Sequence, residues 1–169
     1  MQFPGILLYN KYTARIPLKI DLTTGDKLTP SEINYRYQLL FEDKKIEISS
    51  YNLETLLAEK LETIVSRSKT NTRMRDFYDV YILTLELKEK INIELLAASL
   101  TETAKNRGTY KAIKNDKNII IDIFKSDIIL SHWNRYRNKF QYAKEIEFSN
   151  LEEQIILYKY STKYYKKML

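Results

Sequence analysis

Residues 52–64 read NLETLLAEKLETI, and this stretch decides the fold of the chain. Its apolar residues recur at the spacing of one helical face: they are Leu53, Leu56, Leu57, Leu61 and Ile64. At about 100° per residue, Lys60 falls inside this stripe. A charge on a buried face is costly unless it is paired. Either the long side chain passes the edge of the stripe to reach solvent, or the ammonium points into a cleft where it can hold phosphate.

A second polar cluster follows in residues 71–79, which read NTRMRDFYD. Helical spacing puts four residues on one face: Phe77, Val80, Tyr81 and Thr84. Asp76 and Asp79 lie on the face beside it, and Arg73 and Arg75 lie in the same turns. Two acids and two arginines this close together favour either a local set of salt bridges that joins helices, or the polar edge of a nucleotide pocket.

Short apolar runs before these helices are typical of β-strands. Residues 6–9 (ILLY) and 16–22 (IPLKIDL) predict a hairpin, because the second run alternates apolar and polar residues. Residues 35–41 and 46–48 predict two further extended segments. Strands followed by helices favour an α+β fold, with a small sheet followed by a helical bundle.

Helical patterns fill the rest of the chain. They predict helices over residues 53–67, 73–87, 93–106, one or two within 119–142, and one from Ser149 toward Lys167. Asn52 is the expected N-cap of the first helix and Gly108 the expected C-cap of the third. Ser149 and Glu152 form a capping box, S-x-x-E. We expect Trp133 to lie in the core rather than to stack on a base.

The composition excludes several chemistries. There is no cysteine and only one histidine, His132, so disulfides, thiolate sites and His-rich zinc sites cannot form. Three glycines leave no phosphate-cradling loop. Carboxylate-held Mg²⁺ is then the most natural catalytic chemistry. Asp21, two residues after Lys19 near a turn, is a candidate metal ligand or general base.

The charge balance is basic. The chain has 28 Lys and Arg against 22 Asp and Glu, a net charge of +6 and a pI near 9.2. This favours a polyanionic partner, or simply reflects a Lys-rich composition. Residues 159–167 (KYSTKYYKK) can hold phosphates and stack on bases, or form a solvated helix face. No apolar run reaches the roughly 18 residues of a membrane span, and no signal peptide is recognisable, so we expect a cytoplasmic protein without a membrane partner.

Residues 16–26, 51–62 and 71–81 together resemble the AbiE-type (AbiEii/AbiGii) nucleotidyltransferase toxins in motif, order and spacing. The most specific parts are Ala-Glu-Lys at 58–60 and Arg-x-Arg-Asp-x-x-Asp at 73–79. The resemblance implies a partial polymerase-β-like nucleotidyltransferase sheet followed by a C-terminal helical bundle.

The domains and activity are also implied by the resemblance. Residues 1–88 would form a partial nucleotidyltransferase domain, and residues 89–169 a helical C-terminal domain. The family implies transfer of NMP from NTP, with Mg²⁺, to an RNA, with tRNA the leading candidate. It also implies a role in a toxin–antitoxin or abortive phage infection system, and therefore a cognate antitoxin.

Site roles are carried over residue by residue. Asp21 matches the third carboxylate of the sheet, a candidate catalytic base and metal ligand. Lys60 matches the helix lysine expected on the NTP phosphates. Asp76 and Asp79 fall in the last motif, and we favour Asp76 as the functional acid. The remaining expected nucleotide-binding residues are the basic ones in these motifs: Lys19, Arg73 and Arg75.

One part of the family pattern is absent. No Gly-Ser occurs in the chain, and no Asp-x-Asp precedes Asp21. One carboxylate would hold Mg²⁺ weakly, so we expect a truncated or split toxin that is inactive alone. We also expect self-association, or a separate polypeptide that supplies the missing N-terminal half. The alternative is a non-catalytic module that binds RNA or an antitoxin.

Overall fold

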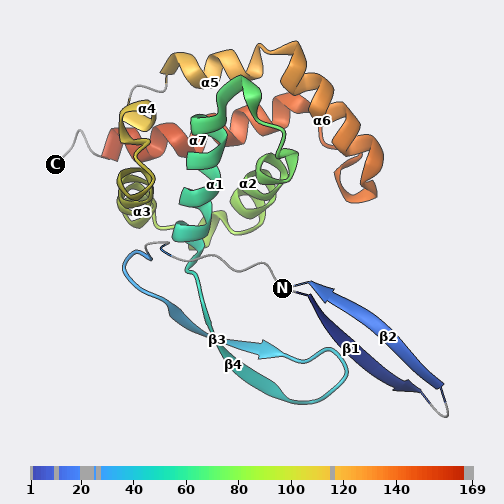
Figure 1. Ribbon diagram of the computed structural model, residues 1–169. Coiled ribbons are helices and arrows are strands. Elements are labelled where there is room, and N and C mark those ends of the chain that lie inside the picture. Colours follow the sequence, from blue (N-terminus) through green and yellow to red (C-terminus); the bar gives the residue numbers. More distant parts are fainter. Residues whose placement is uncertain (1, 10–11, 20–24, 26–27, 115–116, 166–169) are drawn as a thin grey trace.

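The computed structural model confirms the α+β class: two β-hairpins precede a helical part that holds the core (Figure 1). It describes residues 2–9, 12–19, 25, 28–114 and 117–165. None of the helices in these segments is long and apolar enough to cross a membrane.

The strands form two separate antiparallel pairs. The first is β1 (Gln2–Tyr9) with β2 (Tyr12–Lys19), and the second is β3 (Ile33–Gln38) with β4 (Lys45–Ser50). No ladder joins the two hairpins within the described part of the chain. The expected end of the third strand at residue 41 is wrong, because the backbone N–H of Leu39 donates to the carbonyl of Lys44 (3.0 Å) and closes the turn there.

Seven α-helices follow among the described residues. They are α1 (Leu53–Arg67), α2 (Met74–Glu86), α3 (Ile93–Asn106), α4 (Tyr110–Lys114), α5 (Lys117–Phe124), α6 (Asp127–Lys139) and α7 (Phe148–Tyr165). Short 3₁₀ turns lie at Ser68–Thr70, Lys88–Lys90 and Gln141–Ala143. The predicted bounds of α1 and α3 are confirmed. The predicted span 119–142 covers α6 and most of α5, which begins at Lys117, and α4 was not predicted.

Two of the predicted helix caps are present and one is wrong. The side chain of Asn52 accepts from the backbone N–H of Thr55 (2.7 Å) at the start of α1. Gly108 follows α3 with a positive φ of 69°, the left-handed conformation that favours glycine. The expected capping box at Ser149 is wrong, because α7 begins at Phe148 and the side chain of Asn150 accepts from the backbone N–H of Glu147 (3.0 Å).

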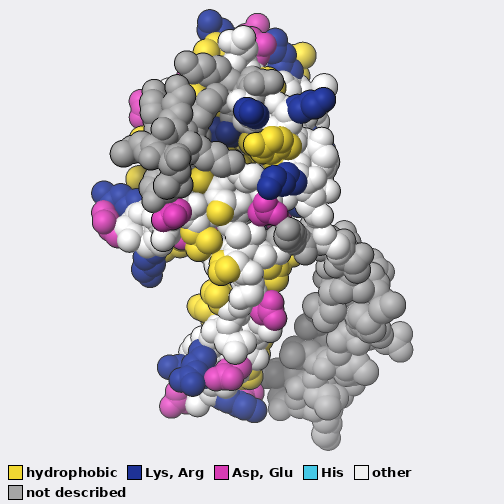
Figure 2. Space-filling model, turned by 90° about the vertical axis from the view of Figure 1, so that its left-hand side faces the viewer, with side chains coloured by type: hydrophobic (Ala, Val, Ile, Leu, Met, Phe, Trp, Pro, Cys, Tyr) yellow, Lys and Arg dark blue, Asp and Glu magenta, His cyan; other side chains and the backbone are white. Residues whose placement is uncertain are grey.

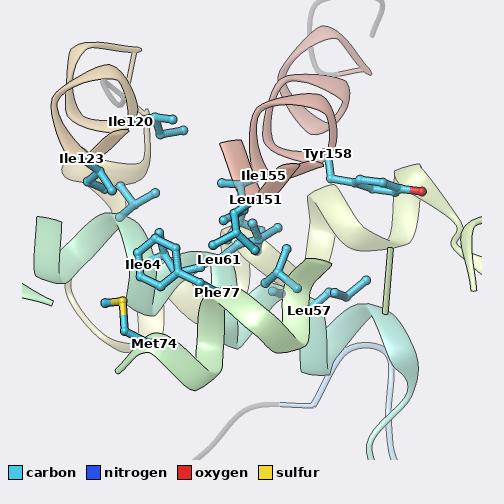
Figure 3. Packing of buried hydrophobic residues seen from close by; sticks show 14 of the residues in the cluster. Leu57, Leu61, Ile64, Met74, Phe77, Ile120, Ile123, Leu151, Ile155 and Tyr158 are labelled. Atoms are coloured by element: carbon cyan, nitrogen blue, oxygen red, sulfur yellow. The ribbon is translucent and has the colours of Figure 1, made fainter. Parts of the chain in front are cut away.

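The core forms where α1 and α2 meet α5 and α7 (Figure 3). Phe77 of α2 is fully buried against apolar side chains of these helices. Trp133 is fully buried as expected, and its indole N–H donates to the carbonyl of Ile146 (3.1 Å). Helices from both sides of residue 88 therefore share one hydrophobic cluster, and the domain boundary at that residue stays a prediction.

The segment before β3 is fixed to the helical part by hydrogen bonds. The carbonyl of Thr29 accepts from Asn52 Nδ2 (2.6 Å), Thr55 Oγ1 (3.1 Å) and Ser99 Oγ (3.4 Å). The β3–β4 hairpin itself extends away from the helices and exposes hydrophobic side chains, as the lower arm that is not grey in Figure 2 shows.

Candidate functional site

Lys60 of α1 meets two acids of α2 at the junction of these helices. Its Nζ lies 2.6 Å from Oδ2 of Asp79 and 3.4 Å from Oδ1 of Asp76. The exposed fractions of the three side chains are 17% for Lys60, 16% for Asp76 and 23% for Asp79. A cluster this well buried is screened less by salt than an ion pair on the open surface.

Helical spacing and one buried asparagine explain this geometry. Asp76 and Asp79 are three residues apart, so α2 presents them on the same side. Asn71, which is fully buried, lies in the connection between α1 and α2. It donates to the carbonyl of Thr63 (3.4 Å) and accepts from the backbone N–H of Arg73 (2.8 Å). These bonds fix the start of α2 relative to α1, and the two acids face Lys60 as a result.

The cluster leaves hydrogen-bonding capacity for a ligand. A lysine ammonium has three N–H donors, and Lys60 meets two acceptor groups. Asp76 Oδ2 is buried and has no hydrogen-bond partner among the described residues. A buried carboxylate oxygen without a partner is costly and marks a place where a water molecule or a ligand donor is expected. The site can therefore receive an acceptor at Lys60 and a donor at Asp76.

Three tyrosines that the sequence did not single out lie beside the acids. The rings of Tyr78 and Tyr142 are 4.8 Å apart, and the hydroxyls of Tyr136 and Tyr142 are 3.0 Å apart. Burial, then Tyr142 and then the charge of Asp79 raise the pKa of Tyr78. The available signal was the position of Tyr78 between the two acids, but its partners come from the distant α6 segment.

The other expected site residues divide into two groups. Arg75 Nε lies 3.9 Å from Asp79 Oδ2, so the arginine, 81% exposed, borders the cluster. Arg73 stands at the N-cap of α2 and forms no ion pair with a described residue. Lys19 is the last residue of β2, where only the backbone is described, and Asp21 lies outside the described residues.

The geometry argues against one interpretation of Lys60, and its role on phosphate stays a prediction. The side chain does not pass the helix edge to reach water alone, because its ammonium is held by Asp76 and Asp79. For the two acids, the interpretation as a salt-bridge set that joins helices describes the same contacts. The additional observation is the unpartnered oxygen of Asp76, which a purely local salt-bridge set does not require.

A second charged cluster on α1, around Glu62, differs from the Lys60 cluster because its groups only connect two helices. Arg107, after α3, donates to Glu62 Oε2 (2.8 Å), and Thr109 donates to Glu62 Oε1 (2.8 Å). Only 3% of the Glu62 side chain is exposed. Both oxygens of this buried carboxylate have partners, so the cluster connects α1 to the end of α3 and leaves no carboxylate oxygen free.

The described residues do not fit a Mg²⁺ site. Within those segments, no group of three His, Cys, Asp or Glu side chains is placed to hold a metal ion. The two acids at the junction already hold the positive charge of Lys60, which would repel a divalent cation beside it.

Comparison with known proteins gives one result that covers most of the chain. The family model described as "Nucleotidyl transferase AbiEii toxin, Type IV TA system" matches residues 1–154. Neither the comparison with curated proteins nor that with solved structures gave a match. A toxin family that belongs to a type IV toxin–antitoxin system implies a cognate antitoxin as partner. This chain belongs to the AbiEii nucleotidyl transferase toxin family.

Proposed function

We propose that the chain contributes the phosphate-binding part of a nucleotidyltransferase toxin that transfers NMP from NTP to an RNA, with tRNA as the acceptor. Growth arrest by this transfer would serve an abortive-infection response controlled by the antitoxin. The observation that carries the proposal is the half-buried cluster of Lys60, Asp76 and Asp79, which leaves Asp76 Oδ2 without a partner.

Each residue of the cluster has a distinct role in this proposal. The third N–H of Lys60 donates to a phosphate oxygen, while Asp79 keeps the ammonium in place. Positioning and charge stabilisation are the main contributions that a protein makes to phosphoryl transfer. The free oxygen of Asp76 accepts from a hydroxyl of the nucleotide. Arg75 and Arg73 add positive charge beside the phosphates.

In this proposal, Lys60, Asp76 and Asp79 do not hold the metal ions. In-line transfer needs a metal that neutralises the triphosphate and orients the attacking group. Asp21 is one candidate ligand, but the chain has no Asp-x-Asp before it. In this proposal the remaining metal-binding carboxylates lie outside the described residues. Lys60, Asp76 and Asp79 bind and orient the nucleotide.

A transfer assay tests this function. The full chain is mixed with total tRNA, Mg²⁺ and each α-³²P-labelled NTP, with and without a polypeptide that carries the Gly-Ser and Asp-x-Asp motifs of an AbiEii relative. We expect label in tRNA only in the mixture, and about 100-fold less with Lys60→Met, because an interaction with a charged phosphate is lost. Lys90→Met, an exposed lysine elsewhere, is the control.

The outcomes separate the two functional classes. Full labelling by the Lys60→Met chain would show that Lys60 does not bind the phosphates. Binding of tRNA with a steep salt dependence, but without any labelling, would identify a non-catalytic RNA-binding module instead.

A further inference from the structure

One face of α6 lines a pocket next to the start of α2. His132, Arg135, Tyr136 and Lys139 are spaced at i, i+3, i+4 and i+7, so they form a single stripe on the helix. With Met74 they line a cavity of ≈ 320 Å³. This is near the lower end of the about 300–1,000 Å³ typical of small-molecule sites, and suits one nucleotide unit rather than a larger ligand.

The pocket is cationic and its charges are not neutralised. Among the described residues, no Asp or Glu lines it. Arg135 and Lys139 are exposed and form no ion pair with any residue that the structure describes. Arg137, on another side of the same helix, provides the contrast: its guanidinium donates to both carboxylate oxygens of Glu147 (2.7 and 2.8 Å). The basic residues of α6 are thus paired outside the pocket and unpaired at its rim.

Two aromatic side chains, Tyr136 and Phe140, also line the pocket. The ring of Tyr136 stacks on Trp133 with centroids 5.5 Å apart and planes at 22°, and Trp133 is fully buried. Phe140 lies 4.7 Å from Tyr136, and Lys139 Nζ lies 5.4 Å from the centre of the Phe140 ring. Rings held by a buried neighbour, beside cations that form no ion pair with a described residue, are the arrangement that binds single-stranded nucleic acid, through stacking and phosphate contacts.

The pocket adjoins the cluster around Lys60. Tyr136 forms a hydrogen bond with Tyr142 (3.0 Å), whose ring is 4.8 Å from that of Tyr78. In the sequence, Tyr78 lies between Asp76 and Asp79, the two acids that hold Lys60, and the charge of Asp79 raises its pKa. The charge of Asp79 raises the pKa of the Tyr136 hydroxyl and that of Arg75 lowers it, in keeping with this arrangement.

We propose that this pocket binds the single-stranded end of the acceptor RNA, with a phosphodiester between Arg135 and Lys139 and a base on Tyr136. The assignment rests on the proposed function, because it gives the acceptor a place beside the nucleotide. Free NTP offers the same phosphate chemistry, so the experiment includes it as a competitor.

The test measures binding of a short fluorescent single-stranded RNA to the full chain by anisotropy across a salt series. Arg135→Ala/Lys139→Ala is compared with Lys90→Ala/Lys111→Ala, which removes the same charge from exposed positions elsewhere. We expect the pocket variant to lose about tenfold in affinity and to lower the salt slope by about 0.7, since the one phosphate contact held by the two cations is lost. The control should stay within about twofold, because it removes no phosphate contact.

Two results would overturn the assignment. Equal losses in both double variants would mean that the RNA responds only to total charge. Displacement of the RNA by ATP, with the pocket variant weakening ATP to the same extent, would make the pocket a free-nucleotide site.

Comparing RNA binding with nucleotide transfer separates this inference from the proposed function. Normal RNA binding that depends on Arg135 and Lys139 supports the pocket even if no nucleotide transfer is found. Nucleotide transfer with RNA affinity unchanged in the pocket variant would refute the pocket and leave the proposed function intact.

Discussion

Lys60, Asp76 and Asp79 carry a combined formal charge of −1 in a half-buried place, so each depends on the others. Breaking such a group by removing one partner leaves charge without compensation and is more costly than the net value of the pair. The trio therefore has a structural role as well as the proposed binding role. A substitution at Lys60 must be tested with a partner substitution that restores the charge balance.

Tyr136 gives a prediction for alkaline pH. Burial, the hydrogen bond with Tyr142 and the charge of Asp79, in that order, raise its pKa above the usual value. A group whose pKa is higher in the folded state contributes stability that is fully present below its unfolded pKa of about 10, and this is lost as the pH rises further.

We therefore expect the urea midpoint of the wild type to fall as the pH rises above about 10. In Tyr136→Phe the fall should be smaller, because the phenol that must ionise is absent, although Tyr78 also has a raised pKa and remains. An identical fall in both proteins would show that the pKa of Tyr136 is the same in the folded and the unfolded chain.

At the scale of elements, the start of α1 is held by hydrogen bonds to a distant segment of the chain. Asn52 caps the helix through Thr55 and also donates to the carbonyl of Thr29 (2.6 Å). The same side chain therefore fixes α1 and the segment that leads into β3. The sequence predicted the cap, but not the second bond, because Thr29 is distant in the chain.

Asn52→Ala should lower the free energy of unfolding by about 1–2 kcal/mol, since both the cap and the Thr29 contact are lost. Asn52→Asp keeps the cap acceptor and loses the Nδ2 donor, so we expect an intermediate effect. Urea unfolding measures both. An Asp variant as unstable as the Ala variant would mean that the Thr29 bond, and not the cap, stabilises this helix end.

At the scale of the whole molecule, the core connects helices that are far apart in sequence. Leu61 of α1 and Ile155 of α7 are both fully buried in one cluster (Figure 3). Two independent domains divided at residue 88 would each need a core of its own. The shared cluster instead predicts that the helical part unfolds as one unit.

Leu61→Ala and Ile155→Ala test this expectation. Each should cost about 2–5 kcal/mol, because a large buried side chain is truncated and leaves a cavity. Circular dichroism and the fluorescence of Trp133 should report the same shifted urea transition in both variants. Two transitions, with each variant shifting only one, would support separate domains at the predicted boundary.

The sequence predicted what local patterns encode. Periodicity and caps gave the bounds of α1 and α3, because Asn52 and Gly108 act within a few residues of their own position. The partners of Lys60 follow 16 and 19 residues later, and only the packing of α1 on α2 brings them together. The spacing of His132, Arg135, Tyr136 and Lys139 on α6 can be read from the sequence. Whether this stripe lines a pocket depends on how Trp133 packs, which the sequence does not give. The motifs that resemble the family include Lys60, Asp76 and Asp79, so the sequence predicted these residues but not their contacts.

The most direct test of Lys60 is equilibrium binding of NTP to the full chain. We expect Lys60→Met to weaken binding by about 10–100-fold, as for a lost hydrogen bond between charged groups of about 1.5–3 kcal/mol. Lys60→Arg should retain part of the affinity. Lys60→Met/Asp79→Asn, which leaves one acid fewer at the junction, should recover stability but not NTP binding. NTP affinity that is unchanged in Lys60→Met, or recovered in the double variant, would contradict a phosphate-binding role for this lysine.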